Sequence, residues 1–445
     1  MAEHPVTVEA VRFRRMFPWL HLFRTFWIAA DLRKLVLAGT ALLLIASGEW
    51  VFEHLPFAPR AQSSEETPRT SKPSPWPWDQ KLGYDLRRGD GALALAGGVL
   101  ASPALTLDGV VSNWPVVLRP MTALLASPLA LLQPQSTWSD RAYHVTRFLW
   151  SLCVWAIFGG AITRMAAVQF AREQQVGLRA ALKFAGRRFL DYVSAPLLPL
   201  GAVMLLVSLC ALGNLLGRIP GAGEYIVGLF WGAGLLVSFL MALILIGIGT
   251  GWPLMFATIS VEASDGFDGL SRAYNYVFER PWLYLWSIVV AMCYGSLVIF
   301  FVWFVGQFVI ELSQWGAAWS LGATDAASLL SKTPELFRTS QAEPVNSPEA
   351  YSQGARLVGA WLCGLALLVM GFVHSYFWTT ATVIYFVLRH SADGNDFDEV
   401  HLDDSSEPDD LLPLVGEAAM AAQAAANAPA PAAGSPAARP IDLTP

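Results

Sequence analysis

The stretch Glu262–Pro281, EASDGFDGLSRAYNYVFERP, is a polar interval between two long hydrophobic runs, and the arrangement of the rest of the chain follows from it. Asp265 is placed to cap a helix, because a short acidic side chain at that position accepts from the free N–H groups of the first turn. Asp268 follows three residues later, as in a capping box, and pairs with Arg272 at i,i+4 spacing. Pro281 ends the helix before the next hydrophobic run. We therefore interpret the stretch as a short helix lying on a membrane surface, with Asp265, Asp268 and Arg272 in structural roles.

The composition is that of an integral membrane protein. Of the 445 residues, 54% are hydrophobic and only 14% are charged, whereas soluble domains carry about 25% charged residues. A membrane-spanning helix needs about 20 apolar residues. Runs of this kind occupy residues 35–53, 147–169, 193–216, 225–250, 283–311 and 354–388. The sequence thus predicts an all-α integral membrane protein with about six transmembrane helices.

Lysine and arginine are distributed unevenly between the loops. The loop after the second span holds six of them, whereas the turn after the third span holds only Arg218. Because cytoplasmic loops are enriched in basic residues, the loop after the second span is predicted to be cytoplasmic. With six spans, both termini then lie in the cytoplasm. We expect a multi-pass protein of the bacterial inner membrane whose main partner is the lipid bilayer, and we expect no binding of nucleic acid.

The predicted organisation has five parts. They are a basic cytoplasmic interfacial arm (1–34), transmembrane helix 1 (35–53), an extracytoplasmic region with a Pro/Ser-rich linker and an interfacial helix (54–146), a five-span helical domain (147–389) and an acidic, Ala/Pro-rich cytoplasmic tail (390–445). Residues 393–445 hold eleven acids and one base, and such a composition predicts disorder. The alternative for the tail is a docking site for a basic protein partner. Residues 110–133 carry three prolines, and the sequence leaves open whether they re-enter the membrane.

A second polar interval, Glu173–Asp191, has the design of the first. Its cations Arg179, Lys183 and Arg187 recur at steps of four, opposite an apolar stripe. Such a helix is expected to rest its apolar face on acyl chains and to place its cations on anionic headgroups at the cytoplasmic face. The alternative is a solvated basic loop.

The two intervals align at an offset of 89 residues. Five aligned pairs are identical or similar: Glu173 with Glu262, Gly177 with Gly266, Leu178 with Phe267, Lys183 with Arg272, and Phe189 with Phe278. Each interval also follows an even-numbered span and precedes an odd-numbered one. The sequence therefore predicts an architecture that is built twice, with two cytoplasmic interfacial helices.

The run VEASDGFDGLSRAYNYVFERPW (261–282), together with FGGAITRMAAVQFAREQQVGLRAALKF (158–184), resembles the signature of a family of uncharacterised bacterial polytopic membrane proteins. The resemblance covers roughly residues 150–400. The element between the spans is also similar, more distantly, to the membrane domains attached to glycerophosphodiester phosphodiesterases. The second resemblance implies a shared fold and no shared activity, because the hydrolase domain itself is missing from this sequence. Neither resemblance assigns chemistry to a residue.

The sequence contains no phosphate-binding loop, metalloprotease motif or serine hydrolase motif. The four cysteines fall in four different predicted spans, and we expect neither a cofactor nor a metal site nor catalytic residues. Polar residues inside spans are the remaining pointers to function, and these are His374, Gln307 and Asn214. They mark a transport or proton path in one interpretation and groups satisfied by neighbouring helices in the other.

Glycine is concentrated in the fourth span, where Gly228 and Gly232 have GxxxG spacing and Gly247, Gly249 and Gly251 precede Pro253. Small residues let helices pack closely, and the alternative is a broken helix whose freed carbonyls line a path. Taken together, the sequence favours a non-enzymatic scaffold or accessory membrane subunit. A small-molecule or lipid transporter that uses spans four to six is the alternative, and an intramembrane enzyme is disfavoured.

Overall fold

A computed structural model of the chain describes residues 18–55, 74–84, 94–131, 137–337 and 352–402. Regular structure in these ranges is helical throughout, and they contain no strand. The helices of these ranges all lie in one compact unit, residues 1–400. Most of the predicted Pro/Ser-rich linker, and the predicted disordered tail from residue 403 onward, lie outside the described residues.

Seven helical segments of the described ranges are long and apolar enough to cross a membrane, so the chain is a multi-pass membrane protein whose described part is all-α. Six of them correspond to the predicted spans: α3 (Leu32–Glu53), α7 (Trp138–Arg172), α9 (Phe189–Leu215), α10 (Gly223–Glu262), α12 (Pro281–Leu321) and α14 (Ser352–Asp393). The seventh, Pro103–Leu131, is composed of α5 (Pro103–Ser112), the 3₁₀ turn η3 (Trp114–Leu118) and α6 (Arg119–Leu131). The shorter elements are η1 (Pro18–Arg24), α2 (Thr25–Ala29), η2 (Pro77–Asp79), α4 (Ala94–Ala101), α8 (Leu178–Arg187), η4 (Leu216–Arg218), α11 (Gly266–Glu279) and α13 (Ala323–Leu329).

At two places the ordered structure extends beyond the apolar run from which it was predicted, and each extension has a local cause. Helix α7 begins at Trp138 rather than at residue 147, because Thr137 and Asp140 form a capping box that starts the helix before its apolar run. The compact unit extends through Val400 rather than stopping at residue 389, because the segment after α14 is held by contacts to Arg389.

The centre of the unit consists of α7, α10 and α14, which pack against one another, with α3 alongside α7 and α14. Glycines allow the close approach. A Cβ atom on Gly159 would lie 2.9 Å from the indole of Trp378, and one on Gly160 would lie 2.7 Å from the ring of Tyr192. Both aromatic side chains are almost fully buried, so these glycines are sites where large rings fill the space that a side chain would need.

Helices α3 and α7 run antiparallel to each other. At one end Arg147 forms an ion pair with Glu49 at 2.6 Å. At the other end Arg33, in the first turn of α3, donates to the backbone carbonyl of Val176, just beyond the end of α7, at 3.4 Å. The long connection between the two helices therefore begins and ends at the same end of the bundle.

Within that connection the chain follows α12 towards its middle. The backbone N–H of Leu95 donates to the carboxylate of Glu311, near the far end of α12. Further along the chain, the hydroxyl of Ser296 donates to the carbonyl of Val110, and Val117 in η3 lies against Gly295. Helix α6 then returns along α7. The segment α5–η3–α6 is thus a hairpin of short helices whose tip lies against Gly295 and Ser296 in the first half of α12.

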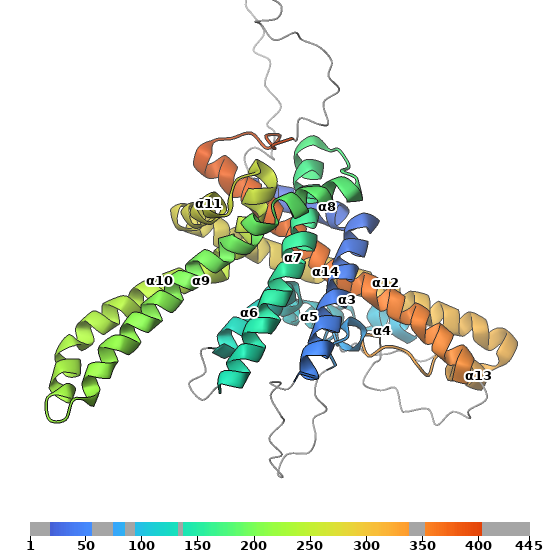
Figure 1. Ribbon diagram of the computed structural model, residues 1–445. Coiled ribbons are helices and arrows are strands. Elements are labelled where there is room, and N and C mark those ends of the chain that lie inside the picture. Colours follow the sequence, from blue (N-terminus) through green and yellow to red (C-terminus); the bar gives the residue numbers. More distant parts are fainter. Residues whose placement is uncertain (1–17, 56–73, 85–93, 132–136, 338–351, 403–445) are drawn as a thin grey trace, which may run out of the picture. The chain divides into compact units, whose positions relative to one another are not determined.

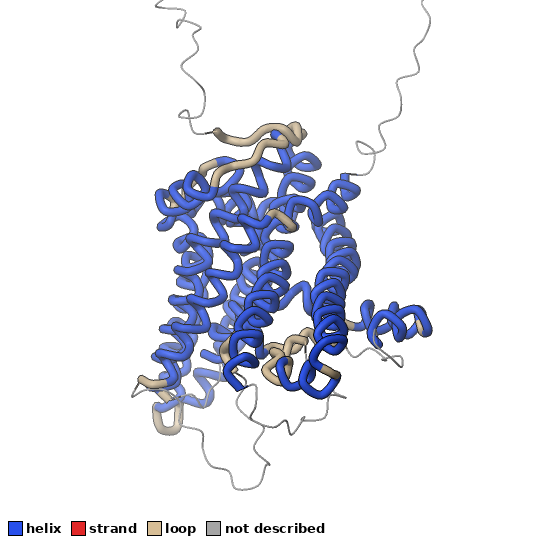
Figure 2. Tube along the Cα trace, turned by 90° about the vertical axis from the view of Figure 1, so that its right-hand side faces the viewer, coloured by secondary structure: helices blue, strands red, loops and turns tan. Residues whose placement is uncertain are grey.

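Helices α9 and α10 form a long hairpin, and Figure 1 shows its far part extending away from α7 and α14. Figure 2 draws the described segments as helices and loops. Residues 204–246 are mostly exposed, although they are strongly apolar. Helix α10 is continuous through Pro253, so it is not a broken helix. Its glycines divide into two groups. Cβ atoms on Gly228 and Gly232 would meet no other atom within 4 Å, whereas one on Gly247 would lie 2.2 Å from the ring of Tyr274.

Both predicted short helices exist, and each follows a long helix that ends in a left-handed residue, Glu173 (φ 57°) or Ala263 (φ 52°). Helix α8 buries Ala181 and Phe184 against the protein, so its apolar face is not free to rest on acyl chains, contrary to the prediction from the sequence. Helix α11 packs along the last part of α10 and also contacts α9.

Candidate functional site: a polar network where α10, α11 and α14 meet

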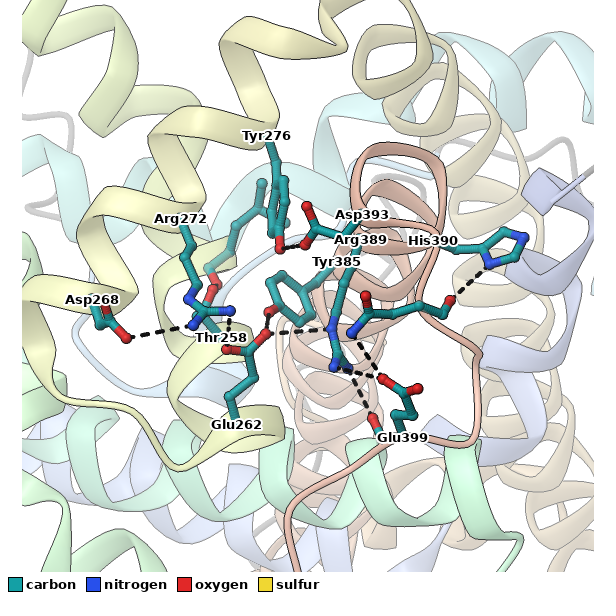
Figure 3. A network of polar contacts seen from close by, with 12 residues as sticks. Thr258, Glu262, Asp268, Arg272, Tyr276, Tyr385, Arg389, His390, Asp393 and Glu399 are labelled. Atoms are coloured by element: carbon teal, nitrogen blue, oxygen red, sulfur yellow. Dashed lines mark hydrogen bonds and ion pairs between the residues drawn. The ribbon is translucent and has the colours of Figure 1, made fainter.

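A cluster of charged and polar groups in contact lies where α10, α11 and α14 meet (Figure 3). Helix α10 ends at Glu262, and the left-handed Ala263 then turns the chain into α11. Helix α14 ends at Asp393, and Gly394 (φ 74°) turns the chain there in the same way. A left-handed residue is common after the last turn of a helix, where glycine adopts it without strain. These two turns direct the groups at the helix ends towards one another.

Glu262 is the centre of the network and is the residue with which the polar interval begins. Its Oε2 accepts an ion pair from Arg272 of α11 at 2.5 Å, and its Oε1 accepts from the Tyr385 hydroxyl of α14 at 2.5 Å. The Nε of Arg389 lies 3.4 Å from the same Oε1. Figure 3 shows Glu262 between Arg272 on one side and Tyr385 with Arg389 on the other. One carboxylate thus joins three helices.

Burial separates the strong contacts of the network from the weak ones. The side chains of Glu262 and Arg389 are 12% and 11% exposed, whereas Arg272 is 44% and Asp268 53% exposed. The contact between Asp268 and Arg272, at 3.6 Å, is the i,i+4 pair that the sequence predicts, but Arg272 lies closer to Glu262. Exposed pairs contribute at most about 1 kcal/mol, so the predicted pair is the minor contact of Arg272.

The segment after α14 is fixed by a second set of contacts. Arg389 donates to the backbone carbonyl of Glu399 at 2.8 Å and to its carboxylate at 3.2 Å. Asn395 also donates to that carboxylate, at 2.8 Å, and His390 contacts the carbonyl of Asn395 at 2.8 Å. On the other side, Tyr276 of α11 donates to Asp393. Arg389 is the buried link between Glu262 and this segment.

The pKa values of two groups in α11 reflect these surroundings. Burial raises the pKa of the Tyr276 phenol, and the hydrogen bond to Asp393 raises it further. Burial alone would lower the pKa of Arg272, but the carboxylate of Glu262 and the other groups nearby raise it overall. Tyr276 therefore stays neutral and Arg272 stays charged over the physiological range. Both residues are in the state that their partners require, and neither is poised to exchange a proton near neutral pH.

Glu173, at the turn between α7 and α8, is tied to the N-terminal arm. Arg24 of η1 forms an ion pair with Glu173 at 2.7 Å, and its guanidinium lies over the ring of Phe170. The ring of His21 packs between Phe170 and Phe397, at centroid distances of 5.6 and 4.6 Å. The N-terminal arm and the segment after α14 thus meet at the same end of the bundle.

Between α7 and α10 lies a buried polar cluster that the sequence did not reveal. Arg164 of α7 donates to the backbone carbonyl of Ser260 at 2.9 Å and lies over the ring of Phe184, 4.3 Å from its centroid. The hydroxyl of Ser260 also contacts Thr163 at 2.5 Å and Tyr192 at 2.7 Å. Every one of these contacts joins one helix to another, so this cluster holds α7, α8, α9 and α10 together.

The three predicted intramembrane polar residues are not brought together. His374 is buried, stacks on Trp155 at a centroid distance of 5.2 Å, and contacts the carbonyl of Met370 in its own helix at 3.0 Å. Gln307 is buried in α12, and its Oε1 has no hydrogen-bond partner among the described residues. Asn214 is exposed near the end of α9, beside an open cleft of about 480 Å³ between α9 and α10. These positions do not form a continuous polar path.

The other residues singled out from the sequence lie on α8 and α11. Asp265 accepts from the backbone N–H of Asp268 at 2.8 Å and so caps α11. The side chains of Arg179, Lys183 and Arg187 are exposed on α8. Clusters of three or more His, Cys, Asp or Glu that suit a metal ion are absent from the described ranges.

Glu399 and the other partners at the end of α14 were missed because they lie more than 100 residues from Glu262 in sequence. A usable signal was present, because Glu262 and Arg389 each end a hydrophobic run, and the distribution of basic residues predicts that both ends lie at the same membrane face.

Comparison of the chain with protein families, curated proteins and solved structures finds no match. The function of the chain therefore has to be inferred from its own residues and their contacts.

Proposed function

We propose that this chain is a non-enzymatic scaffold or accessory subunit of the bacterial inner membrane. One observation carries the proposal: the charged and polar groups at the end of the bundle are engaged with one another and so hold helices together. Glu262 has three donors around it, and Arg389 has both Glu262 and Glu399. A catalytic carboxylate needs room for a substrate within hydrogen-bond reach, and these contacts fill that room.

We also propose six membrane crossings and one re-entrant hairpin. The supporting argument is geometric, because the ring contact between His21 and Phe397 puts the two ends of the unit on one side, which requires an even number of crossings. Among the seven candidate segments, Pro103–Leu131 is the one whose helices are too short to cross singly. The basic loop after α7 then assigns the shared side to the cytoplasm.

In this arrangement α8 and α11 lie at the cytoplasmic interface in different ways. Helix α8 presents its exposed cations Arg179 and Lys183 to anionic headgroups, while its apolar face packs on the protein. Helix α11 exposes Phe267 and Phe278, which are 68% and 51% exposed and suit contact with acyl chains. The acidic tail would serve as a docking site for a basic protein partner. We retain the resemblance to the uncharacterised polytopic family as part of the proposal.

The scaffold proposal is tested by cross-linking in native membranes, followed by affinity purification of the full chain. We expect another membrane protein to be recovered in a fixed ratio to this one. Recovery of this chain alone, together with solute flux in proteoliposomes that is lost in His374→Ala, would overturn the proposal. Trp155→Phe is the matched control for His374→Ala, since it changes the partner in the same stacked pair and keeps the imidazole.

The second candidate is a transporter of a lipid or an apolar small molecule through spans four to six. It is favoured by a cavity of about 160 Å³ that is lined by α10, α12 and α14, the same three spans. The cavity separates the two candidates, because a scaffold tolerates a plug in it and a transporter does not. Flux that survives a cavity-filling substitution would exclude this route.

A further inference from the structure

The cavity between spans four to six has a buried floor and an open rim. Its floor on α14 is formed by Phe377, Thr380, Ala381 and Ile384, which are at most 7% exposed. Its rim is half-buried and comprises Gly249 and Thr250 of α10, Ile288 and Met292 of α12, and Leu118 and Met121 beside the hairpin tip. A molecule that touches the floor must therefore enter past the rim.

The cavity lies where the 3₁₀ turn η3 meets a stretch of the continuous helix α10 that lacks a bulky side chain. The 3₁₀ turn η3 contributes Val117 and Leu118, and α10 contributes Gly249 and Pro253. A Cβ atom on Gly249 would meet no atom within 4 Å, so the glycine leaves open space rather than a close helix contact. Non-helical backbone at membrane depth occurs where it is covered by protein or lines a cavity.

The lining is almost wholly apolar. Of its three hydroxyl side chains, Tyr284 donates to the carbonyl of Thr250 at 2.5 Å, and Thr250 donates to the carbonyl of Ile246 at 2.8 Å. The third hydroxyl, that of Thr380 on the floor, is buried and lies beside Tyr376, so the lining offers a ligand almost no accessible polar group. A buried water needs two to four polar partners, so these side chains suit a hydrocarbon better than water.

Size and surroundings limit the ligand further. The volume of about 160 Å³ is close to that of an apolar cavity of about 150 Å³ that takes up benzene. It therefore admits a short length of hydrocarbon and not a whole lipid. In the proposed membrane arrangement the molecules that reach the rim are those of the bilayer. Lipid tails are as apolar as leucine, so the gain on entry comes from filling the void with van der Waals contacts.

We propose that this cavity holds the terminal part of one acyl chain of a bilayer phospholipid. The proposal rests on the proposed membrane insertion, and it names the molecule that the spans four to six would handle. It also gives the hairpin α5–η3–α6 a role, since its tip forms one wall of the binding site.

The test uses the full chain in phosphatidylcholine vesicles that contain a small fraction of the same lipid with a photoreactive diazirine at the end of one acyl chain. After irradiation, the adducts are located by mass spectrometry. We expect adducts at two places, the floor residues 377–384 and the exposed residues 223–246 of the α9–α10 hairpin. Adducts on residues 223–246 are called hairpin adducts, and they do not lie on the hairpin α5–η3–α6. The hairpin adducts report membrane insertion alone, and the floor adducts report entry into the cavity.

Gly249→Phe should fill the cavity, and Gly232→Phe is its matched control in the same helix, because a side chain at either position starts in open space. We expect Gly249→Phe to lose the floor adducts and keep the hairpin adducts, and Gly232→Phe to keep both. Gly249→Leu provides a smaller plug should the phenylalanine prevent folding.

Three results would overturn the proposal. Floor adducts that are absent in the wild type, while hairpin adducts are present, would mean that no phospholipid chain enters. Floor adducts that persist unchanged in both Gly249 variants would mean that the label reaches α14 by another route. Floor labelling by a photoreactive free fatty acid, but not by the phospholipid, would assign the site to a different ligand. Loss of the hairpin adducts would instead contradict membrane insertion itself.

Discussion

Replacing Glu262 with glutamine tests whether the network stabilises the fold. Glu262→Gln keeps the size of the side chain and the acceptor for Tyr385 but removes the charge that faces Arg272 and Arg389. Removing one partner of a buried ion pair typically costs about 3–5 kcal/mol. Arg272 is 44% exposed and keeps Asp268, and Arg389 keeps Glu399, so we expect the lower end of that range, about 3 kcal/mol.

The measurement is the free energy of unfolding in an SDS titration of the purified protein in mixed micelles, followed by far-UV circular dichroism. Asp268→Asn is the matched control, since it removes an acid of the same network that is 53% exposed and lies 3.6 Å from Arg272. We expect it to change the free energy of unfolding by about 0.5 kcal/mol or less. Added salt should weaken the contact of Asp268 and leave the effect of Glu262→Gln largely unchanged, because buried pairs are screened less. Equal losses in the two variants would refute the assignment of Glu262 as the centre.

Three further predictions concern other parts of the fold. Burial and a hydrogen bond raise the pKa of Tyr276, so its contribution to the free energy of unfolding is present below pH 10 and is lost as the pH rises above 10. In unfolding titrations on both sides of pH 10, Tyr276→Phe should lose less free energy of unfolding than the wild type does. Gly247→Ala should lower the free energy of unfolding by about 1–3 kcal/mol because the added methyl group overpacks against the ring of Tyr274. Gly249→Ala, two residues on, should be neutral or stabilising. The same SDS titration compares the two variants, and equal effects would contradict the packing argument. In a cysteine-free background, His54→Cys and Ser139→Cys should react with an impermeant thiol reagent from the same side of the membrane, and labelling from opposite sides would show that the segment between them crosses.

The helices were predictable because each depends on local features. Apolar runs of sufficient length gave the six long helices, and the acid at position 265 gave the start of α11. The capping box that starts α7 was equally readable from Thr137 and Asp140, ahead of the apolar run that begins at residue 147. In each case the deciding residues are neighbours in the chain.

The hairpin α5–η3–α6 and the polar network around Glu262 were not predictable in this way. Three prolines in residues 110–133 are compatible with a surface helix and with a re-entrant one, and the sequence does not reveal that Val110 and Val117 lie beside Ser296 and Gly295 of α12. The spacing of the glycines in α10 does not reveal which of them are packed against another helix. Gly247 packs against the ring of Tyr274, whereas Gly232 faces open space, because α11 covers only the second half of α10.

The two polar intervals that align in the sequence differ most clearly in structure at their glutamates. Glu173 and Glu262 align in sequence, but Glu173 is the left-handed residue that ends its helix, whereas Glu262 is still helical and Ala263 takes the left-handed position. This shift of one residue turns Glu173 outward, where its side chain is 75% exposed and pairs with Arg24, and turns Glu262 inward, where it is 12% exposed. Surface pairs contribute little and buried pairs depend strongly on both partners. The same residue type at equivalent positions thus fastens the N-terminal arm loosely in one copy and fixes the end of α14 in the other.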